Sequence, residues 1–408
     1  MQSVDSAPIT VSPRASAISE AGDKAYFTVA LQGSPHGPVR IDISIDPPSE
    51  ARAVPSTLIF MPNDSSPRSF QVEAVDDDVF DGDIHVAVRL DVRSADPRYR
   101  YQPPALDVLS VDDDYVVTGY RKVRLFEDAD GANPVRLNNR GQVVADVAHY
   151  SQSNLLHAEI WDNGVITDLG YPTRATGMND AGVVVGHYND DRYSFRYEDG
   201  ELTSIPGEVH AINDRGHIVG DALYVEGTRT ELAGGQAVTG LAMNDADHVT
   251  GWFPAPPYYR YAFYWDGAFA DLGSMGGPWN AGLAINEHDQ LVGYMWDPNI
   301  NYHAIYFDGG SMVDLGTATG MPGALATGIN NRGDIVGNDH DGGLATQGWI
   351  GRVGQPLRTF QSQLVDGSCF FMMEVQDIND RGQVLVRGWE CGIGSPHAYL
   401  FEPIKSAR

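Results

Sequence analysis

A motif that recurs seven times constrains the fold of this chain more than any other feature. The motif is Asn-x-x-Gly-x-Val-x-Gly, and its clearest copies span Asn179–Gly186, Asn213–Gly220 and Asn330–Gly337. Weaker copies begin at Asn138, Asn244, Asn286 and Asn379. Neighbouring copies start 31 to 49 residues apart, and each is followed by an aromatic strand, a tight turn and a further strand. One unit therefore holds about four short strands in roughly 40 residues, the size of one blade of a β-propeller.

The two ends of the repeat region complement each other. The last copy stops after its third strand, His397–Phe401, whereas Tyr120–Phe126, ahead of the first copy, resembles a fourth strand without a sheet. Pairing of these two segments would complete the seventh blade and remove the exposed sheet edges. Residues 115–408 are therefore predicted to form a seven-bladed β-propeller that is closed by this pairing.

Residues 1–114 lack the motif and show a different pattern. Apolar and polar residues alternate over Val39–Ile45, and the segments around Phe27, Phe70 and Val86 alternate in the same way. Strands of period two that are separated by Pro, Gly and Asp are typical of a small β-sandwich. The chain is thus predicted to be all-β, with a β-sandwich over residues 1–114 followed by the propeller over residues 115–408.

Charge and composition exclude some partners. The chain has 55 Asp and Glu against 27 Lys and Arg, a net charge of −28, which argues against nucleic acid as a partner. The acids are 41 Asp and 14 Glu, and Asp is the acid that turns and calcium loops use. No apolar run approaches ~18 residues, so no membrane span is expected. We expect a monomer.

The amino terminus leaves the compartment open. Met1–Thr10 has neither the basic start nor the apolar stretch of a signal peptide. Either the protein is cytosolic, or a signal was removed from the chain. The domain types described next favour the second alternative, a secreted or periplasmic protein.

The repeat resembles the bacterial extracellular repeat of the HAF family, which is named after a His-Ala-Phe motif. The corresponding segments are His157-Ala158-Glu159, Tyr261-Ala262-Phe263, His303-Ala304-Ile305 and His397-Ala398-Tyr399. The resemblance extends over about residues 117–403, and the Asn-x-x-Gly and Asp-Leu-Gly elements make it fairly specific. It implies secretion but hardly any defined biochemistry.

The first domain resembles a Calx-β domain. Three acidic segments carry this resemblance: Ser19–Gly22, Val75–Asp83 and Val111–Asp114. In calcium-binding members these segments converge at one end of the sandwich, where their oxygens suit Ca²⁺. The implied ligands are Glu20, Asp76, Asp77, Asp81, Asp112, Asp113 and Asp114. Ile84 stands where such members often have Glu, and the alternative is a solvated acidic end whose site has decayed.

The propeller is expected to carry its tight turns on one face and its long, variable segments on the other. Variable loops carry function more often than the scaffold does. Aromatic rings with a polar rim suit stacking on sugar rings or on an extended organic ligand. The predicted ligand-binding residues on the variable face are Trp252, Tyr258, Tyr259, Arg260, Tyr294, Trp296 and Trp389, with Trp279 and Tyr302 nearby. The alternative is that several of these rings pack one blade against the next.

The histidines fall into two groups. His157, His303 and His397 recur at the same place in their units and are expected to be structural. A catalytic site would need a histidine outside this group within hydrogen-bond reach of an acid, a Tyr or an Arg. The catalytic candidates are His149, Tyr150, His187, Tyr188, Arg192, Arg260 and His340. The sequence contains no nucleophile elbow, zinc helix, phosphate loop or dinucleotide fingerprint, and no organic cofactor is expected.

The chain has two cysteines, Cys369 and Cys391. Both are predicted on the variable face, where a disulfide between them would form in an oxidising compartment. The alternative is two free or buried thiols.

Three functional hypotheses follow. Dense repetition without a catalytic motif favours a secreted or periplasmic binding protein whose variable face binds a glycan or another extracellular ligand. The second hypothesis is a polysaccharide lyase or glycosidase with a His/Tyr/Arg or acidic site in the central pocket, because propellers host such activities. The third is a structural adhesion module that uses calcium.

Overall fold

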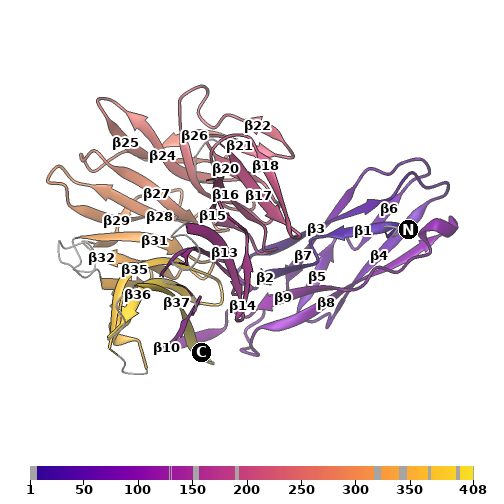
Figure 1. Ribbon diagram of the computed structural model, residues 1–408, viewed down its shortest axis with the longest axis horizontal. Helices are drawn as coiled ribbons and strands as arrows, with labels where there is room; N and C mark the ends of the chain where they lie inside the picture. Colours follow the sequence, from indigo (N-terminus) through magenta and orange to yellow (C-terminus); the bar gives the residue numbers. More distant parts are fainter. Residues whose placement is uncertain are drawn as a thin grey trace. The chain divides into compact units, whose positions relative to one another are not determined.

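The computed structural model describes residues 7–127, 129, 131–149, 156–188, 193–316, 323–339, 347–365, 369–391 and 396–407. The chain is all-β and divides into two compact units, Met1–Asp114 and Tyr115–Arg408. The described elements are 37 strands and two short 3-10 turns, η1 (Pro97–Tyr99) and η3 (Phe360–Ser362) (Figure 1). Within the described ranges, no helix is long and apolar enough to cross a membrane.

The first unit consists of two sheets with one shared apolar core. The four-stranded sheet has the order β1 (Ile9–Ser12), β3 (Lys24–Leu31), β7 (Arg68–Ala74) and β5 (Ala51–Val54). The five-stranded sheet has the order β2 (Ala15–Ser19), β9 (Leu106–Val111), β8 (Ile84–Ser94), β4 (Val39–Asp46) and β6 (Thr57–Phe60). Alternate side chains point into the core, and the rings of Phe27 and Phe70 stack there with centroids 5.2 Å apart. Alternating hydrophobicity thus buries one face of each sheet.

The second unit contains seven four-stranded antiparallel sheets, which we number 1 to 7 in the order of their Asn-x-x-Gly motifs. Sheet 1 comprises β11 (Gly131–Leu137), β12 (Val143–Ala148), β13 (Leu156–Asp162) and β14 (Val165–Asp168). Sheet 2 comprises β15 (Thr173–Met178), β16 (Val184–Tyr188), β17 (Ser194–Glu198) and β18 (Glu201–Ile205). Sheet 3 comprises β19 (Val209–Ile212), β20 (Ile218–Gly220), β21 (Leu223–Val225) and β22 (Thr228–Thr230).

The remaining sheets follow the same plan until the last. Sheet 4 comprises β23 (Thr239–Met243), β24 (Val249–Ala255), β25 (Tyr259–Trp265) and β26 (Phe269–Asp271). Sheet 5 comprises β27 (Asn280–Ile285), β28 (Leu291–Trp296), β29 (Tyr302–Phe307) and β30 (Val313–Asp314). Sheet 6 comprises β31 (Ala324–Ile329), β32 (Ile335–Asp339), β33 (Gln347–Gly351) and β34 (Arg358–Thr359). Sheet 7 comprises β35 (Phe370–Ile378), β36 (Val384–Glu390), β37 (His397–Ala407) and β10 (Tyr115–Arg124).

Sheet 7 is built from both ends of the repeat region. Strand β10 pairs with β37 in an antiparallel ladder that runs from Tyr115 opposite Ala407 to Arg124 opposite Tyr399. Tyr120 of β10 is 1% exposed and belongs to the same core cluster as the β37 residues. The segment that the sequence left without a sheet therefore supplies the fourth strand of the last one.

A bulge in the first strand explains the last glycine of the motif. In sheet 4 the register shifts between Gly240 and Ala242, directly beside Gly251. A Cβ at Gly251 would collide with the carbonyl oxygen of Thr239. A side chain at this position would therefore force the two strands apart.

The motif asparagines form a closed ring of hydrogen bonds. The Nδ2 of each donates to the backbone oxygen of the next, in the order Asn138, Asn179, Asn213, Asn244, Asn286, Asn330, Asn379 and back to Asn138. Each Oδ1 accepts the backbone N–H of the residue four positions later. All seven side chains are buried. The repeated asparagine thus satisfies buried backbone groups of its own turn and of the next sheet.

The residues that follow these asparagines form a second closed ring, which we call the acidic ring. Its members are Asn139, Asp180, Asp214, Asp245, Glu287, Asn331 and Asp380, and the backbone N–H of each donates to the side-chain oxygen of the next. Burial, reinforced by neighbouring carboxylates, raises the pKa of Asp214 and of Asp245 well above the ordinary value. Asn139 and Asn331 make the same hydrogen bond without a charge.

Candidate functional site

The antiparallel order of the strands separates two kinds of connection. The Asn-x-x-Gly turn joins the first strand of a sheet to the second, and the turn between the third and fourth strands lies at the same end. The connection between the second and third strands lies at the opposite end, which we call the loop end. The loop end of sheets 4 and 5 carries most of the predicted aromatic residues.

Five side chains at this end form what we call the tryptophan–arginine cluster: Trp252, Arg260, Trp279, Trp296 and Tyr302. The Arg260 guanidinium lies 4.0 Å from the ring centroid of Trp252 and 4.9 Å from that of Trp279. The rings of Trp279 and Trp296 are 6.1 Å apart, and Tyr302 meets Trp296 edge-on with centroids 5.0 Å apart. A cation held between two indoles and an adjoining aromatic row are thus brought together from two sheets.

Backbone contacts fix this cluster. Asn280 is fully buried, and its Nδ2 donates to the backbone oxygen of Arg260 over 3.1 Å. Its Oδ1 accepts the backbone N–H of Trp296, also over 3.1 Å. The backbone N–H of Arg260 donates to the carbonyl oxygen of Pro278 over 2.8 Å. One buried amide therefore ties the strands that carry Arg260 and Trp296 to each other.

The cluster offers a ligand both an apolar face and polar groups. Trp279 remains 41% exposed, although it packs against Arg260 and Trp296. Among the described residues, no carboxylate forms an ion pair with the Arg260 guanidinium. The Nε1 of Trp296 is buried and has no hydrogen-bond partner among the residues that the structure describes. An exposed indole beside a cation without an acidic partner is suited to a flat, polar ligand.

The other predicted ligand-binding residues divide between the cluster and other places. Tyr294 joins it through Tyr302, at 5.6 Å between ring centroids, and burial raises the pKa of Tyr294. Tyr258 is 92% exposed on the same loop end as its neighbour Tyr259. Trp389 belongs to sheet 7 and is not part of the cluster.

Tyr259 and Trp389 each pair with one further ring. Tyr259 lies against Tyr261 of its own strand, with centroids 6.3 Å apart. Trp389 packs against Phe371, with centroids 5.7 Å apart, and Phe371 lines a separate pocket of about 510 Å³. These contacts place the two residues outside the stack around Arg260.

Among the described catalytic candidates, His149, His187 and Arg260 each contact other residues and not one another. Tyr150, Arg192 and His340 lie outside the described residues. The Nδ1 of His187 lies 3.2 Å from the Oγ of Ser194 in the same sheet. Tyr188 packs against Phe195, with ring centroids 5.5 Å apart, in the core of sheet 2.

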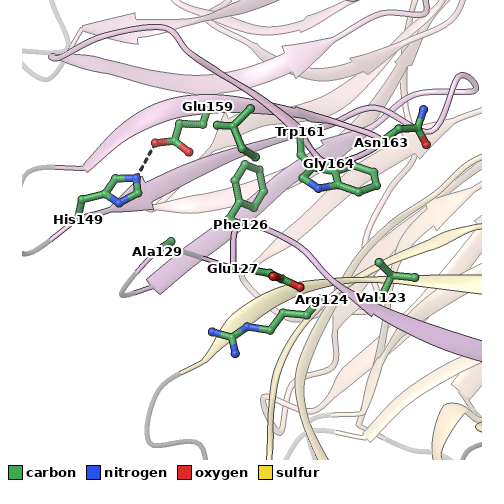
Figure 2. A pocket seen from close by; sticks show the side chains of 11 residues that line it. Val123, Arg124, Phe126, Glu127, Ala129, His149, Glu159, Trp161, Asn163 and Gly164 are labelled. Carbon is green, nitrogen blue, oxygen red and sulfur yellow. Dashed lines mark hydrogen bonds and ion pairs between the residues drawn. The ribbon is translucent and has the colours of Figure 1, made fainter.

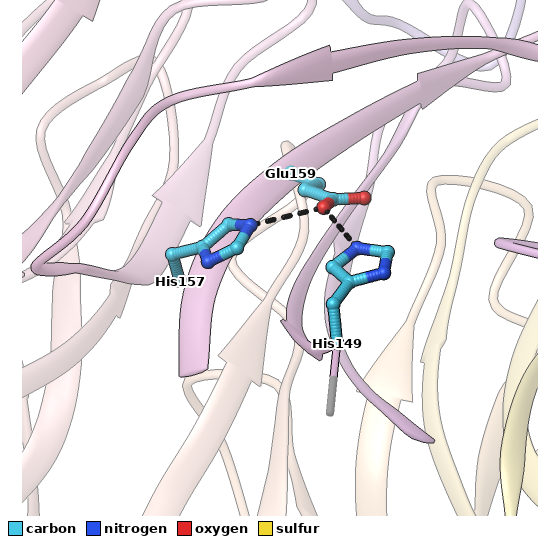
Figure 3. Close-up of side chains that lie close together, drawn as sticks. All are labelled: His149, His157 and Glu159. Atoms are coloured by element: carbon cyan, nitrogen blue, oxygen red, sulfur yellow. Dashed lines mark hydrogen bonds and ion pairs between the residues drawn. The ribbon is translucent and has the colours of Figure 1, made fainter. Parts of the chain in front are cut away.

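His149 has the acidic neighbour that a general base would need. Its Nε2 lies 2.7 Å from the Oε1 of Glu159, and the Nε2 of His157 lies 3.1 Å from the same oxygen (Figure 3). His149 and Glu159 line a pocket of about 550 Å³, together with Arg124, Phe126 and Trp161 (Figure 2). This pocket lies between β10 of sheet 7 and β13 of sheet 1.

Acidic residues of the first unit converge at one end of its sandwich. The Glu20 backbone N–H donates to the carbonyl oxygen of Val111 over 3.1 Å, and carboxylate oxygens of Glu20, Asp113 and Asp114 lie within 4.8 Å of one another. The Oε2 of Glu20 is buried and finds no hydrogen-bond partner in the described part of the chain. Burial, followed by the charge of Asp112, raises the pKa of Glu20 to about 8.

The predicted ligands from the middle segment lie nearer the surface. Asp76, Asp77 and Asp81 are exposed, and the Oδ1 of Asp77 accepts the backbone N–H of Val79 over 2.7 Å. Asp77 nevertheless contributes to the raised pKa of Glu20. Although Asp81 is exposed, partial desolvation of its carboxylate and then the charge of Glu50 raise its pKa, so Glu50 adds a carboxylate to this end that the sequence did not indicate.

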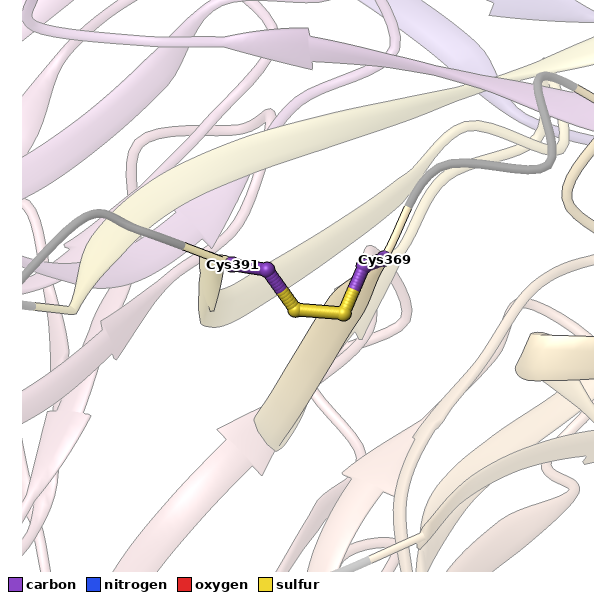
Figure 4. The surroundings of a disulfide bond; sticks show 2 residues. All are labelled: Cys369 and Cys391. Atoms are coloured by element: carbon purple, nitrogen blue, oxygen red, sulfur yellow. A yellow bond between two sulfur atoms is a disulfide. The ribbon is translucent and has the colours of Figure 1, made fainter.

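The two cysteines form a disulfide at the loop end of sheet 7 (Figure 4). Cys369 precedes β35 and Cys391 follows β36, with Cα atoms 5.4 Å apart. The backbone N–H of Cys391 donates to the carbonyl oxygen of Cys369 over 3.1 Å. The disulfide therefore links β35 and β36 covalently at the open end of their hairpin.

Comparisons with known proteins give likenesses of fold alone. No family model matches the chain, and no curated protein matches it. The apo form of the Calx CBD1 domain covers 26% of this chain and 96% of its own length, at 20% identity and a TM-score of 0.19. The structure of YCF48 bound to D1 peptide covers 70% of this chain and 94% of its own, at 10% identity and a TM-score of 0.42.

A β-propeller domain gives a similar result. The β-propeller domain of the Trilobed protease from Pyrococcus furiosus covers 79% of this chain and 89% of its own, at 10% identity and a TM-score of 0.37. The similar structures thus include a Calx domain and a β-propeller domain.

Two features of the second unit are not indicated by the motifs that the sequence analysis uses. Glu159 stands in the first HAF-type segment, where an acid departs from the aromatic or aliphatic residue of the other copies. The members of the acidic ring are the residues that directly follow the motif asparagines. Both features are visible when the copies are aligned position by position.

Proposed function

We propose that this protein is a secreted or periplasmic binding protein whose tryptophan–arginine cluster binds an extracellular glycan. The observation that carries the proposal is the position of Arg260 between the rings of Trp252 and Trp279, with no ion-pair partner among the described residues. Indole faces stack on the C–H face of sugar rings, and the edge of a guanidinium binds a carboxylate. The glycan class that fits best therefore carries uronate groups.

The proposal includes a closed seven-bladed β-propeller of HAF-type repeats as the scaffold. Three observations support closure: seven four-stranded sheets, the pairing of β10 with β37, and a ring of asparagine hydrogen bonds that returns to its start. The Cys369–Cys391 disulfide supports an oxidising compartment.

The acidic end of the first unit is proposed to bind Ca²⁺. Glu20, Asp77, Asp81, Asp112, Asp113 and Asp114 would supply the oxygens, with Glu50 beside Asp81. A cation would provide the buried Oε2 of Glu20 with a partner and would offset the repulsion among these carboxylates. Asp76 is exposed like Asp77 and Asp81 and is a further proposed ligand.

The test is a binding screen of the full chain against neutral and uronate-containing oligosaccharides, measured by isothermal titration calorimetry. We expect uronate oligosaccharides to bind, and Trp279→Ala and Arg260→Gln each to weaken binding by about 10-fold or more. Trp265→Ala is the matched control, because Trp265 lies at the opposite end of β25 from Arg260. Equal affinity in the wild type and in both cluster variants would refute the proposal, as would the absence of any ligand in the panel.

One observation favours the second hypothesis, a polysaccharide lyase or glycosidase. His149 lies 2.7 Å from the buried acid Glu159 at the edge of a pocket. The same panel tests for this activity when reducing ends and unsaturated products are measured. Cleavage that is lost in His149→Ala would replace the binding proposal by an enzymatic one, whereas intact oligosaccharides after long incubation would support binding.

A further inference from the structure

Glu159 occupies a position that is hydrophobic in five of the other six sheets. The strand register places Glu159 opposite Ala145. Ala145 lies seven residues after Asn138, the motif asparagine of sheet 1. The equivalent positions in sheets 2, 4, 5, 6 and 7 hold Phe195, Phe263, Ile305, Trp349 and Tyr399, each fully buried. Glu159 is itself only 4% exposed.

Such a substitution is unfavourable for the fold alone. A buried carboxylate costs several kcal/mol unless partners compensate it, whereas the large apolar side chains of the other sheets stabilise the core. An acid that stands alone in this way among repeated hydrophobic residues indicates a role that only sheet 1 performs.

Two imidazoles converge on this carboxylate. The Nε2 of His149 lies 2.7 Å and the Nε2 of His157 lies 3.1 Å from the Oε1 of Glu159. The two imidazole rings lie nearly parallel, 22° apart, with centroids separated by 5.7 Å. Figure 3 shows both rings pointing toward the same carboxylate oxygen from opposite sides.

The His157 contact with an acid has a structural counterpart in sheet 5, whereas the His149–Glu159 pair has none among the described residues. In sheet 5 the equivalent His303 pairs through Nδ1 with Asp314 at 2.9 Å. His157 similarly has Asp168 of β14 within 3.4 Å. The repeated His–Asp pair therefore has a structural role in these sheets. In sheet 1, Glu159 and His149 join the histidine of this pair to form a three-residue cluster.

The spacing of the three ligand atoms matches a metal site. Zinc binds imidazole nitrogen at about 2.0–2.1 Å and carboxylate oxygen at about 2.0–2.2 Å, so tetrahedral ligands lie roughly 3.4 Å apart. The ligand atoms of His149, His157 and Glu159 all lie within 4.8 Å of one another. Binding of one ion would require side-chain rotation that opens the 2.7 Å and 3.1 Å separations from the Glu159 oxygen toward roughly 3.4 Å.

We propose that His149, His157 and Glu159 bind a divalent transition-metal ion of the Zn²⁺ class. Two imidazoles and one carboxylate suit Zn²⁺ rather than Ca²⁺, which prefers a cage of oxygens. With three protein ligands, the remaining coordination position is open to the pocket of about 550 Å³ that His149 and Glu159 line. Arg124 lines the same pocket, so an anionic oxygen ligand suits that position.

The test is a Zn²⁺ titration of the full chain against a chromophoric chelator, with excess Ca²⁺ present to fill carboxylate sites. We expect one tight site per chain, and Co²⁺ in its place is expected to give the intense visible absorption of tetrahedral coordination. His149→Ala and Glu159→Gln should each weaken binding by more than about 100-fold, beyond the effect of a residue outside the ligand set.

Two further measurements separate ligation from folding. His303→Ala alters the equivalent histidine of sheet 5 and should leave Zn²⁺ affinity unchanged. Zn²⁺ should raise the thermal unfolding midpoint of the wild type but not that of His149→Ala, each compared with its own metal-free midpoint, because His149→Ala also removes a hydrogen-bond partner of the buried Glu159. Unchanged Zn²⁺ affinity in His149→Ala and Glu159→Gln, or a Co²⁺ spectrum typical of octahedral coordination, would overturn the proposal.

Discussion

The asparagine ring allows the stability of the second unit to be predicted quantitatively. The Asn179 side chain is 6% exposed, and its Nδ2 donates to the backbone oxygen of Asn213 over 3.0 Å. Its Oδ1 accepts the backbone N–H of Val183 over 3.0 Å. Asn179→Ala leaves the buried N–H of Val183 without a partner and leaves the Asn213 carbonyl with only the backbone N–H of Gly216. Because an unpartnered buried group costs roughly 1–3 kcal/mol and a lost hydrogen bond about 1 kcal/mol, we expect the free energy of unfolding to fall by about 2–4 kcal/mol.

Tryptophan fluorescence measures this change in one unit alone. All seven tryptophans lie beyond residue 160, so a guanidinium titration followed by tryptophan emission reports on the second unit. The midpoint should fall with little change in the slope m. Asn299→Ala, at an exposed position of the same unit, is the control and should change stability by less than about 0.5 kcal/mol.

Asn179→Asp distinguishes the two hydrogen bonds. Aspartate keeps the acceptor for the Val183 N–H but loses the donor to the Asn213 carbonyl and adds a charge beside it. We expect a loss comparable to that of the alanine variant at neutral pH. A loss below about 1 kcal/mol for Asn179→Ala would refute the reasoning, because the ring would then contribute no more than an exposed polar side chain.

Three other predictions concern charge, covalent linkage and pH. Asp245→Asn should stabilise the second unit by about 1 kcal/mol at neutral pH, because Asn331 already makes the equivalent hydrogen bond of the acidic ring without a charge. An acid with a raised pKa contributes its stability only at low pH, so the gain from Asp245→Asn should shrink toward about pH 4. A net loss of stability at neutral pH would contradict the prediction. Replacing Cys369 and Cys391 by Ser should lower stability by about 3 kcal/mol, from the loop entropy of a 22-residue separation, and reductant should then have no further effect on the fluorescence midpoint. Burial and neighbouring carboxylates raise the pKa of Glu20 to about 8, so its contribution to stability is fully present below about pH 4.3 and is lost as the pH rises through about 8. Hydrogen exchange of the first unit should show this loss of stability. Glu20→Gln should abolish the pH dependence, and Ca²⁺ should restore the stability of the wild type only.

The sequence indicated the strands of the second unit because its repeat places turn residues and apolar residues at fixed intervals. Asn244 and Gly251 illustrate the two reasons: the first satisfies buried backbone groups, and the second avoids a collision at a bulge. Both requirements recur in nearly every sheet, so they are visible as a pattern. The sheets of the second unit could therefore be predicted from two local requirements, hydrogen bonds for buried backbone groups and space at the bulge.

The candidate site followed from the sequence only in part. The motif spacing indicated that Trp252, Arg260 and Trp296 share one end of neighbouring sheets, and these residues do form one cluster. Trp389 satisfied the same rule of residue type and loop position, but it follows the Asn379 motif and lies in sheet 7, outside the cluster. The stacking of Arg260 between two indoles depends on side-chain orientation, which spacing does not encode.

Glu159 shows a different limit. Its significance appears only when the strand register identifies which residue faces the last position of the motif, because the HAF segment varies at this position. A buried acid is recognised as unusual only against the hydrophobic residues that replace it elsewhere, such as Phe263 and Ile305.

The pairing of β10 with β37 has a consequence for synthesis of the chain. Strand β10 begins at Tyr115, whereas its partner begins at His397. At about 5–20 residues per second, a ribosome needs roughly 15–60 s to make the chain between them. During that interval β10 has no strand to pair with, and its unpaired edge is open to other nascent chains. Closure itself is entropically inexpensive, because the cost of a loop grows only with the logarithm of its length. The risk of wrong pairing is therefore set by how long the β10 edge stays unpaired during synthesis, and not by the stability of the closed sheet. Removal of β37 would leave the β10 edge unpaired permanently.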